Sequence, residues 1–73
     1  MPQYRYRDKL GNHVAVHDGS VEELARLYDY YTRGWPWEIG SKRYRLLTLH
    51  VPPASQVMAA VEVTLEFLPY PDR

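Results

Sequence analysis

Hydrophobic and polar residues alternate with a period of two near the start of the chain. Tyr-Arg-Tyr-Arg at 4–7 and His-Val-Ala-Val-His at 13–17 both have the pattern of half-buried strands. Between them, Leu10-Gly11-Asn12 supplies residues that tolerate the positive φ of a tight hairpin connection. The two segments therefore predict a β-hairpin. The side chains expected to face its core are those of Tyr4, Tyr6, Val14 and Val16.

The apolar period then changes to that of a helix. Ser20 and Glu23 have the spacing of a capping box, in which the Ser20 hydroxyl accepts from the Glu23 amide and the Glu23 carboxylate returns to the Ser20 amide. A helix should therefore begin here. Apolar residues recur at spacings of three and four, and the predicted inward face consists of Val21, Leu24, Ala25, Tyr28 and Tyr31.

The opposite face of this helix is charged. Glu22 precedes Arg26 by four residues, and Asp29 precedes Arg33 by four, which is the favourable order for ion pairs along a helix. Gly34 follows at the position where a left-handed residue commonly ends a helix. The predicted helix therefore runs up to Gly34.

Strand patterns return in the second half of the chain. Residues 37–39 can form a short strand, which a two-residue turn connects to a longer strand at 42–51. That longer strand is apolar on both faces from its middle onward, so we expect it to lie centrally in the sheet. Residues 57–68 alternate apolar residues with glutamate and threonine, as a strand buried on one face does. The tail at 69–73 should be extended and frayed.

These elements predict a single small α+β domain spanning residues 1–73. Its helix packs on one face of a small antiparallel sheet of four or five strands, in the order β-β-α-(β)-β-β. A chain of 73 residues is short enough for one domain only.

Composition excludes several classes of function. Nine basic residues balance nine acidic ones, so no overall positive field draws the chain to nucleic acid or to a membrane surface. The chain has no cysteine, which excludes disulfides, thiolate zinc sites and cysteine nucleophiles. No stretch is long and apolar enough for a membrane span or a signal-peptide core, so we expect a cytoplasmic protein.

The histidines and carboxylates do not predict chemistry. His13 and His17 bracket three residues of a strand, which places them about 13 Å apart, too far to share one metal ion. A metal site would need His50 to lie beside one of them. Glu62 and Glu66 are separated in the same way, beyond the distance used by an acid and base pair. We therefore expect no enzyme activity, no cofactor, no metal and no small-molecule substrate.

Basic residues interleave with tyrosine at two places, which raises nucleic-acid binding as an alternative. Because successive side chains of a strand point to opposite faces, inward tyrosines leave the arginines on the outer face. The resulting arginine stripe consists of Arg5, Arg7, Arg43 and Arg45. Glu62 and Glu66 should neutralise part of it through cross-strand ion pairs.

The aromatic residues around the helix end predict protein binding. Tryptophan, tyrosine and arginine are enriched at the energetic centres of protein interfaces. The predicted binding residues are Tyr30, Arg33, Trp35, Trp37 and Arg43. Alternatively, Trp35 or Trp37 folds back as a lid over the core. We expect a non-enzymatic protein that binds another protein stoichiometrically, as phage or mobile-element inhibitors and accessory proteins do, or that pairs with itself as a homodimer.

Overall fold

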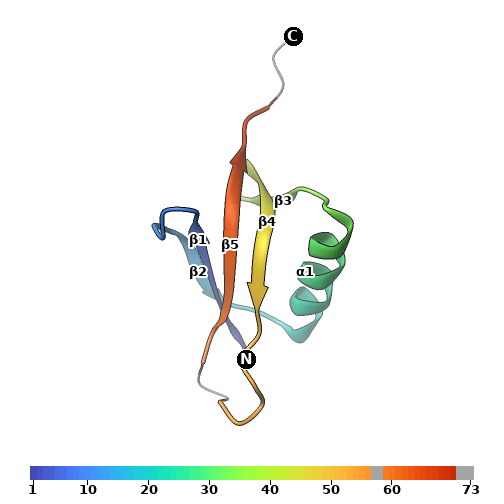
Figure 1. Cartoon of the computed structure of the whole chain (residues 1–73). Helices are drawn as coiled ribbons and strands as arrows, with labels where there is room; N and C mark the ends of the chain where they lie inside the picture. The colour runs from blue at the N-terminus through green and yellow to red at the C-terminus, as the bar shows by residue number, and fades with distance from the viewer. Residues whose placement is uncertain (57–58, 71–73) are drawn as a thin grey trace.

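Among the described residues, five strands form a curled sheet, and one helix lies beside it (Figure 1). The computed structural model describes residues 1–56 and 59–70. The elements are β1 (Gln3–Asp8), β2 (His13–Asp18), α1 (Val21–Arg33), β3 (Trp37–Ile39), β4 (Lys42–His50) and β5 (Val61–Leu68). This confirms the predicted α+β class, including the short strand β3. The predicted start of the last strand at Val57 lies outside the described residues, and β5 is observed from Val61.

The sheet is mixed, with the strand order β2-β1-β5-β4-β3. Strands β1 and β5 pair in parallel, whereas the other three neighbouring pairs are antiparallel. The expectation of a wholly antiparallel sheet was therefore wrong for this one pair. The physical reason is that alternation along a strand shows which face is buried, but it carries no information about the direction of the neighbouring strand.

The core lies between α1 and the face of the sheet that the helix covers. Tyr4 and Tyr6 of β1 are fully buried and lie in register with Val61 and Val63 of β5. Among the described residues, the buried core cluster consists of Tyr4, Tyr6, Leu27, Trp37, Tyr44, Leu46, Val61, Val63 and Leu65. Four large aromatic rings thus supply much of the volume of a small core.

The inward face of the hairpin formed by β1 and β2 agrees in part with the predicted one. Tyr4 lies opposite His17 and Tyr6 opposite Ala15, so these residues share the face that α1 covers. Val16 instead lies opposite Arg5 and is 48% exposed, so the prediction that it faces the core was wrong. A register shift after Tyr6 accompanies this arrangement. Val14 is partly buried against the core, as predicted. Ala15 is also partly buried against the core, and His17 stacks on the rings of Tyr4 and Tyr6.

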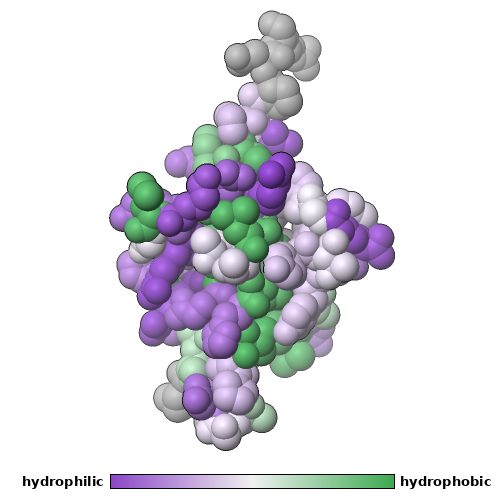
Figure 2. Space-filling model, in the orientation of Figure 1, coloured by the Kyte–Doolittle hydropathy of each residue, from purple (hydrophilic) through white to green (hydrophobic). Residues whose placement is uncertain are grey.

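The buried face of α1 also differs from the predicted one. Leu27 is fully buried, with Leu24 and Tyr30 partly buried against the core. Of the five residues predicted to face inward, only Leu24 is partly buried. Val21 is 67% exposed, and Ala25, Tyr28 and Tyr31 are exposed as well. Two apolar stripes overlap on this helix, and the one through Leu27 packs inward. Figure 2 shows the resulting apolar surface along β4 and beside the lower end of α1.

The predicted ends of α1 are confirmed. The Ser20 hydroxyl accepts a hydrogen bond of 3.2 Å from the Glu23 amide. Gly34 is left-handed, with φ of 72°, and its amide donates to the carbonyl of Tyr30. A Cβ atom is strained in that conformation, which explains the glycine. Within the described part of the chain, no helix is long and apolar enough to cross a membrane.

Candidate functional site: an aromatic cleft between helix and sheet

An open cleft with a volume of about 470 Å³ lies between α1, the first hairpin and the segment 36–39. We call it the aromatic cleft. Aromatic rings and polar groups both line it, and the side chains that the argument uses are those of Tyr6, His17, Glu23, Arg26, Tyr30 and Trp37. The curled sheet therefore brings residues from distant parts of the chain to one hollow.

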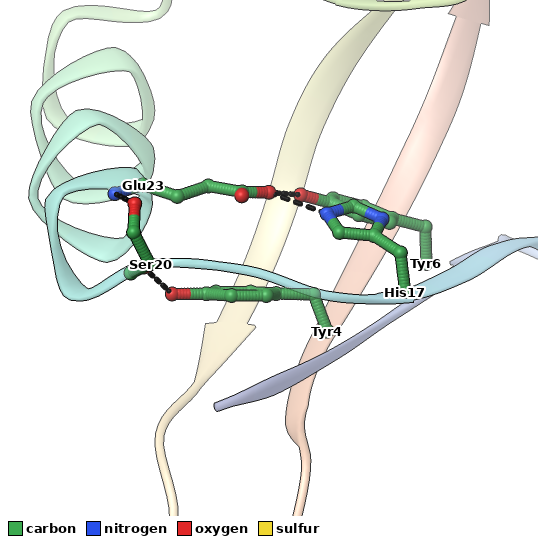
Figure 3. A network of polar contacts seen from close by, with 5 residues as sticks. All are labelled: Tyr4, Tyr6, His17, Ser20 and Glu23. Carbon is green, nitrogen blue, oxygen red and sulfur yellow. Dashed lines mark hydrogen bonds and ion pairs between the residues drawn. The ribbon is translucent and has the colours of Figure 1, made fainter. Parts of the chain in front are cut away.

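One wall of the cleft is a polar network centred on the carboxylate of Glu23 (Figure 3). Tyr6 and His17 reach from the hairpin toward this carboxylate. The Tyr6 hydroxyl donates to Glu23 Oε2 at 3.1 Å, and His17 Nε2 lies 2.6 Å from the same oxygen. The predicted return of this carboxylate to the Ser20 amide is therefore replaced by contacts with the sheet. We call these three side chains the Glu23 network.

The network is reinforced by ring stacking. The imidazole of His17 stacks on the rings of Tyr4 and Tyr6, with centroid distances of 5.6 and 5.5 Å. The Tyr4 hydroxyl donates to the carbonyl of Ser20, which precedes the helix. Both tyrosines therefore connect the sheet to the first turn of α1.

Burial controls the protonation of these two tyrosines. Burial, and then the nearby charge of Glu23, raise the pKa of the Tyr6 hydroxyl well above its ordinary value. The same two causes raise the pKa of Tyr4. Both hydroxyls are therefore protonated donors at neutral pH, as their contacts with Glu23 and Ser20 require.

The opposite wall is built from the rings of Tyr30 and Trp37. Trp35 lies outside the cleft lining, in contact with Tyr30, and we call these three rings the aromatic corner. Tyr30 makes edge-to-face contacts with Trp35 and Trp37, at centroid distances of 5.4 and 5.1 Å. Trp37 is only 8% exposed and belongs to the core, as the lid alternative proposes, whereas Trp35 is 45% exposed. Tyr30 is partly buried rather than on the polar face of the helix, because its ring packs between the two indoles.

Two arginines of α1 extend over this corner. The guanidinium of Arg33 lies 4.7 Å from the ring centroid of Trp35 and donates to Asp29 at 2.7 Å, as the predicted ion pair requires. The guanidinium of Arg26 lies 5.9 Å from the ring centroid of Trp37. The predicted partner of Arg26, Glu22, is absent from the ion pairs of residues 1–56 and 59–70. Arg26 therefore lies over an indole, not beside a carboxylate.

The fifth predicted protein-binding residue, Arg43, lies elsewhere. Its neighbour Tyr44 is buried in the core, so alternation along β4 places Arg43 on the outer face, away from α1. There its guanidinium lies 4.7 Å from the ring centroid of Tyr70 and donates to the carbonyl of Pro69. These contacts hold residues 69–70 of the predicted frayed tail, and residues 71–73 lie outside the described residues. The structure does not bring Arg43 to the aromatic corner.

The predicted arginine stripe does assemble on the outer face of the sheet. Arg5 and Arg7 lie 3.8 and 4.0 Å from oxygens of Glu62. Arg45 and Lys9 lie 3.6 and 2.7 Å from oxygens of Glu66. The predicted cross-strand ion pairs are therefore observed, and they occupy both glutamates of β5.

The structure does not assemble a metal site from the described residues. No group of three or more histidine, aspartate or glutamate side chains among them could hold a metal ion. His17 lies on the edge strand β2 with its side chain 41% exposed, and it is also part of the Glu23 network. One sequence signal pointed to this role. When Tyr4 faces the core, the residue opposite it on the other strand of the hairpin shares that face, and this residue is His17.

Comparison of the chain with models of protein families, with curated proteins and with solved structures finds no match. The function must therefore be argued from the cleft and from the charged outer face.

Proposed function

We propose that this protein is a small non-enzymatic interaction module that binds a segment of another protein in the aromatic cleft. The observation that carries the proposal is the half-exposed indole of Trp35, which stands beside the cleft in contact with Tyr30 and Arg33. A large ring held in place by neighbours loses little freedom when a partner covers it. Tryptophan, tyrosine and arginine in such an arrangement are typical of interface hot spots.

The polar wall of the cleft supports binding rather than catalysis. Tyr6 and His17 both contact the one Glu23 oxygen Oε2, and the Glu23 side chain is only 14% exposed. The carboxylate therefore serves to join the hairpin to the helix. A polar wall opposite the rings of Tyr30 and Trp37, with an exposed indole beside them, suits a partner segment that inserts into the cleft. We further propose a stoichiometric accessory or inhibitor role in the cytoplasm, consistent with the absence of cysteine.

The test compares Trp35, which lies just after the end of α1, with Tyr28, which lies within α1. A partner is first identified by crosslinking to the purified protein, and its affinity is then measured by calorimetry. Trp35→Ala should weaken binding at least tenfold. Tyr28→Ala is the matched control, because Tyr28 is similarly exposed but lies outside the aromatic corner, and it should leave the affinity unchanged. A folded Trp35→Ala variant that keeps full affinity would overturn the proposal.

The same measurements test self-association. Strands β2 and β3 form the two edges of the sheet, and edge strands can pair with a second copy of the chain. The native mass of the purified protein reports this directly. A dimer that survives Trp35→Ala would place the second copy at a sheet edge outside the aromatic cleft.

A second candidate function is nucleic-acid binding through the outer face. The observation that favours it is a surplus of positive charge, because Arg5, Arg7, Arg45 and Lys9 share only two glutamates, and Arg43 contacts backbone and a ring. Affinity for single-stranded DNA should then fall steeply with salt, and Arg5→Glu together with Arg45→Glu should abolish it. Fluorescence anisotropy at low salt with no change on adding DNA would exclude this function.

A further inference from the structure

The charges and the strand edge at the aromatic cleft indicate what kind of segment it accepts. We propose that the partner segment is extended, adds to the free edge of β3, and places an acidic side chain on Arg26. This inference rests on the proposed function, since it names the chemistry of the same binding site.

The first support is the state of Arg26. Its guanidinium is held over the Trp37 ring, and no ion pair among residues 1–56 and 59–70 includes it. Arg33 provides the comparison within the same helix, because it also lies over an indole but is paired with Asp29. A guanidinium stacked on a ring keeps its edge N–H groups free to bind a carboxylate through two hydrogen bonds.

The second support is that the nearby acids do not compete for Arg26. Glu23 is engaged by Tyr6 and His17. Glu38 lines the cleft as part of β3, but its neighbour Trp37 is buried against the helix side. Alternation along the strand therefore directs the Glu38 carboxylate to the outer face, beside its cross-strand partner Arg43. The cation that the cleft offers to a ligand is Arg26.

The third support is the free edge of β3. This strand is last in the sheet order and pairs with β4 only. Residues 36–39 line the cleft, so a segment that occupies the cleft runs alongside this edge. In an antiparallel pair the backbone groups of alternate residues point away from the partner strand, and an added strand can bind them. Such a strand would point alternate side chains toward α1, where Arg26 lies.

The test is a selection from a displayed library of random linear peptides with the folded full chain as target. Cleft binders are recognised because Trp35→Ala weakens them. Among them, aspartate or glutamate should be enriched at one position, and changing that residue to its amide should reduce affinity at least tenfold. Arg26→Glu should reverse the preference to lysine or arginine at that position. Arg45→Glu, on the outer face of the sheet, is the matched control and should leave the acidic preference unchanged.

The outcomes separate the two proposals. Cleft peptides without an acidic position, or an acidic preference that Arg26→Glu leaves intact, would overturn this inference and leave the proposed function standing. A selection that yields no peptide sensitive to Trp35→Ala would overturn both. Circular dichroism of each variant establishes that it is folded, and Arg26→Gln serves in place of Arg26→Glu if charge reversal prevents folding.

Discussion

His17 of β2 and Glu23 of α1 meet with 2.6 Å between Nε2 and Oε2, and the same oxygen accepts from Tyr6 of β1. Ten residues before the end of its helix, Glu23 thereby joins that helix to both strands of the first hairpin. The two partners of Glu23 lie at different separations along the chain, because His17 is 6 residues away and Tyr6 is 17 residues away. The Glu23 network fixes the position of one wall of the aromatic cleft relative to the other.

Removing this carboxylate should destabilise the fold. Glu23→Ala leaves the Tyr6 hydroxyl without its acceptor, and we expect a loss of about 1–3 kcal/mol in the free energy of unfolding. The measurement is urea denaturation followed by tryptophan fluorescence. Glu22→Ala is the control, since Glu22 lies in the same first turn but is exposed and should change stability by less than about 0.5 kcal/mol. Equal losses for the two variants would contradict a special role for Glu23.

Alkaline pH should destabilise the protein through the buried tyrosines. The pKa of Tyr6 is raised above its unfolded value of 10.0, so its contribution to stability is fully present below pH 10. Above that pH the unfolded chain releases a proton that the folded chain keeps. Stability then falls by up to about 1.4 kcal/mol per pH unit for each such group until the folded pKa is reached.

Tyr6→Phe removes one of these groups and should make the decline above pH 10 shallower. Thermal unfolding measured at a series of pH values between about 9 and 12 reports the slope. Tyr28→Phe, on the exposed face of α1, should leave the wild-type slope unchanged. A slope insensitive to Tyr6→Phe would show that other groups control the alkaline transition.

Substitutions along α1 should reveal which of its two apolar stripes is buried. Leu27 is fully buried, so Leu27→Ala should lower the free energy of unfolding by about 2–5 kcal/mol. Val21→Ala should change it by less than about 0.5 kcal/mol, because Val21 is exposed at the start of the helix. Chemical denaturation of both variants measures the difference. The reverse ranking would show that the helix packs through its other face.

Gly19 should resist substitution for steric reasons. A Cβ atom there would lie 2.8 Å from the Tyr4 ring and would also collide with the Glu23 carboxylate. We expect Gly19→Ala to destabilise the protein by about 1–3 kcal/mol through overpacking. The double variant Gly19→Ala with Glu23→Ala should lose less stability than the sum of the two single losses. The reason is that Glu23→Ala removes an atom with which the new Cβ atom collides. Strict additivity in denaturant melts would argue against this collision.

The sequence was sufficient to predict the features that depend on local chemistry. Ser20, Gly34 and the Asp29 to Arg33 pair are all where the helix rules place them. The outward position of the arginine stripe also followed from alternation alone. The direction of β1 relative to β5 did not follow, because that pairing depends on how the chain returns, not on any local pattern.

The site was less accessible to sequence reasoning, since it depends on choices between near-equal alternatives. The predicted apolar stripe of α1 overlaps the stripe that contains Leu27, and the hydrophobic pattern does not choose between them. In the structure the stripe with Leu27 packs inward, and Tyr30 contacts two indoles. The partner of His17 was not predicted, because a histidine in a strand pattern carries no sign of the group that it contacts. That partner was Glu23, which the capping box seemed to explain completely.

The parallel pairing of β1 with β5 has a consequence for how the chain folds. Strand β5 is the last of the described elements along the chain, yet it lies in the middle of the sheet, between β1 and β4. Without β5, strands β1 and β4 have no strand to join them in one sheet. Contacts such as Tyr4 with Val61 span most of the sequence, so the contact order is high and folding should be slow for a protein of this size.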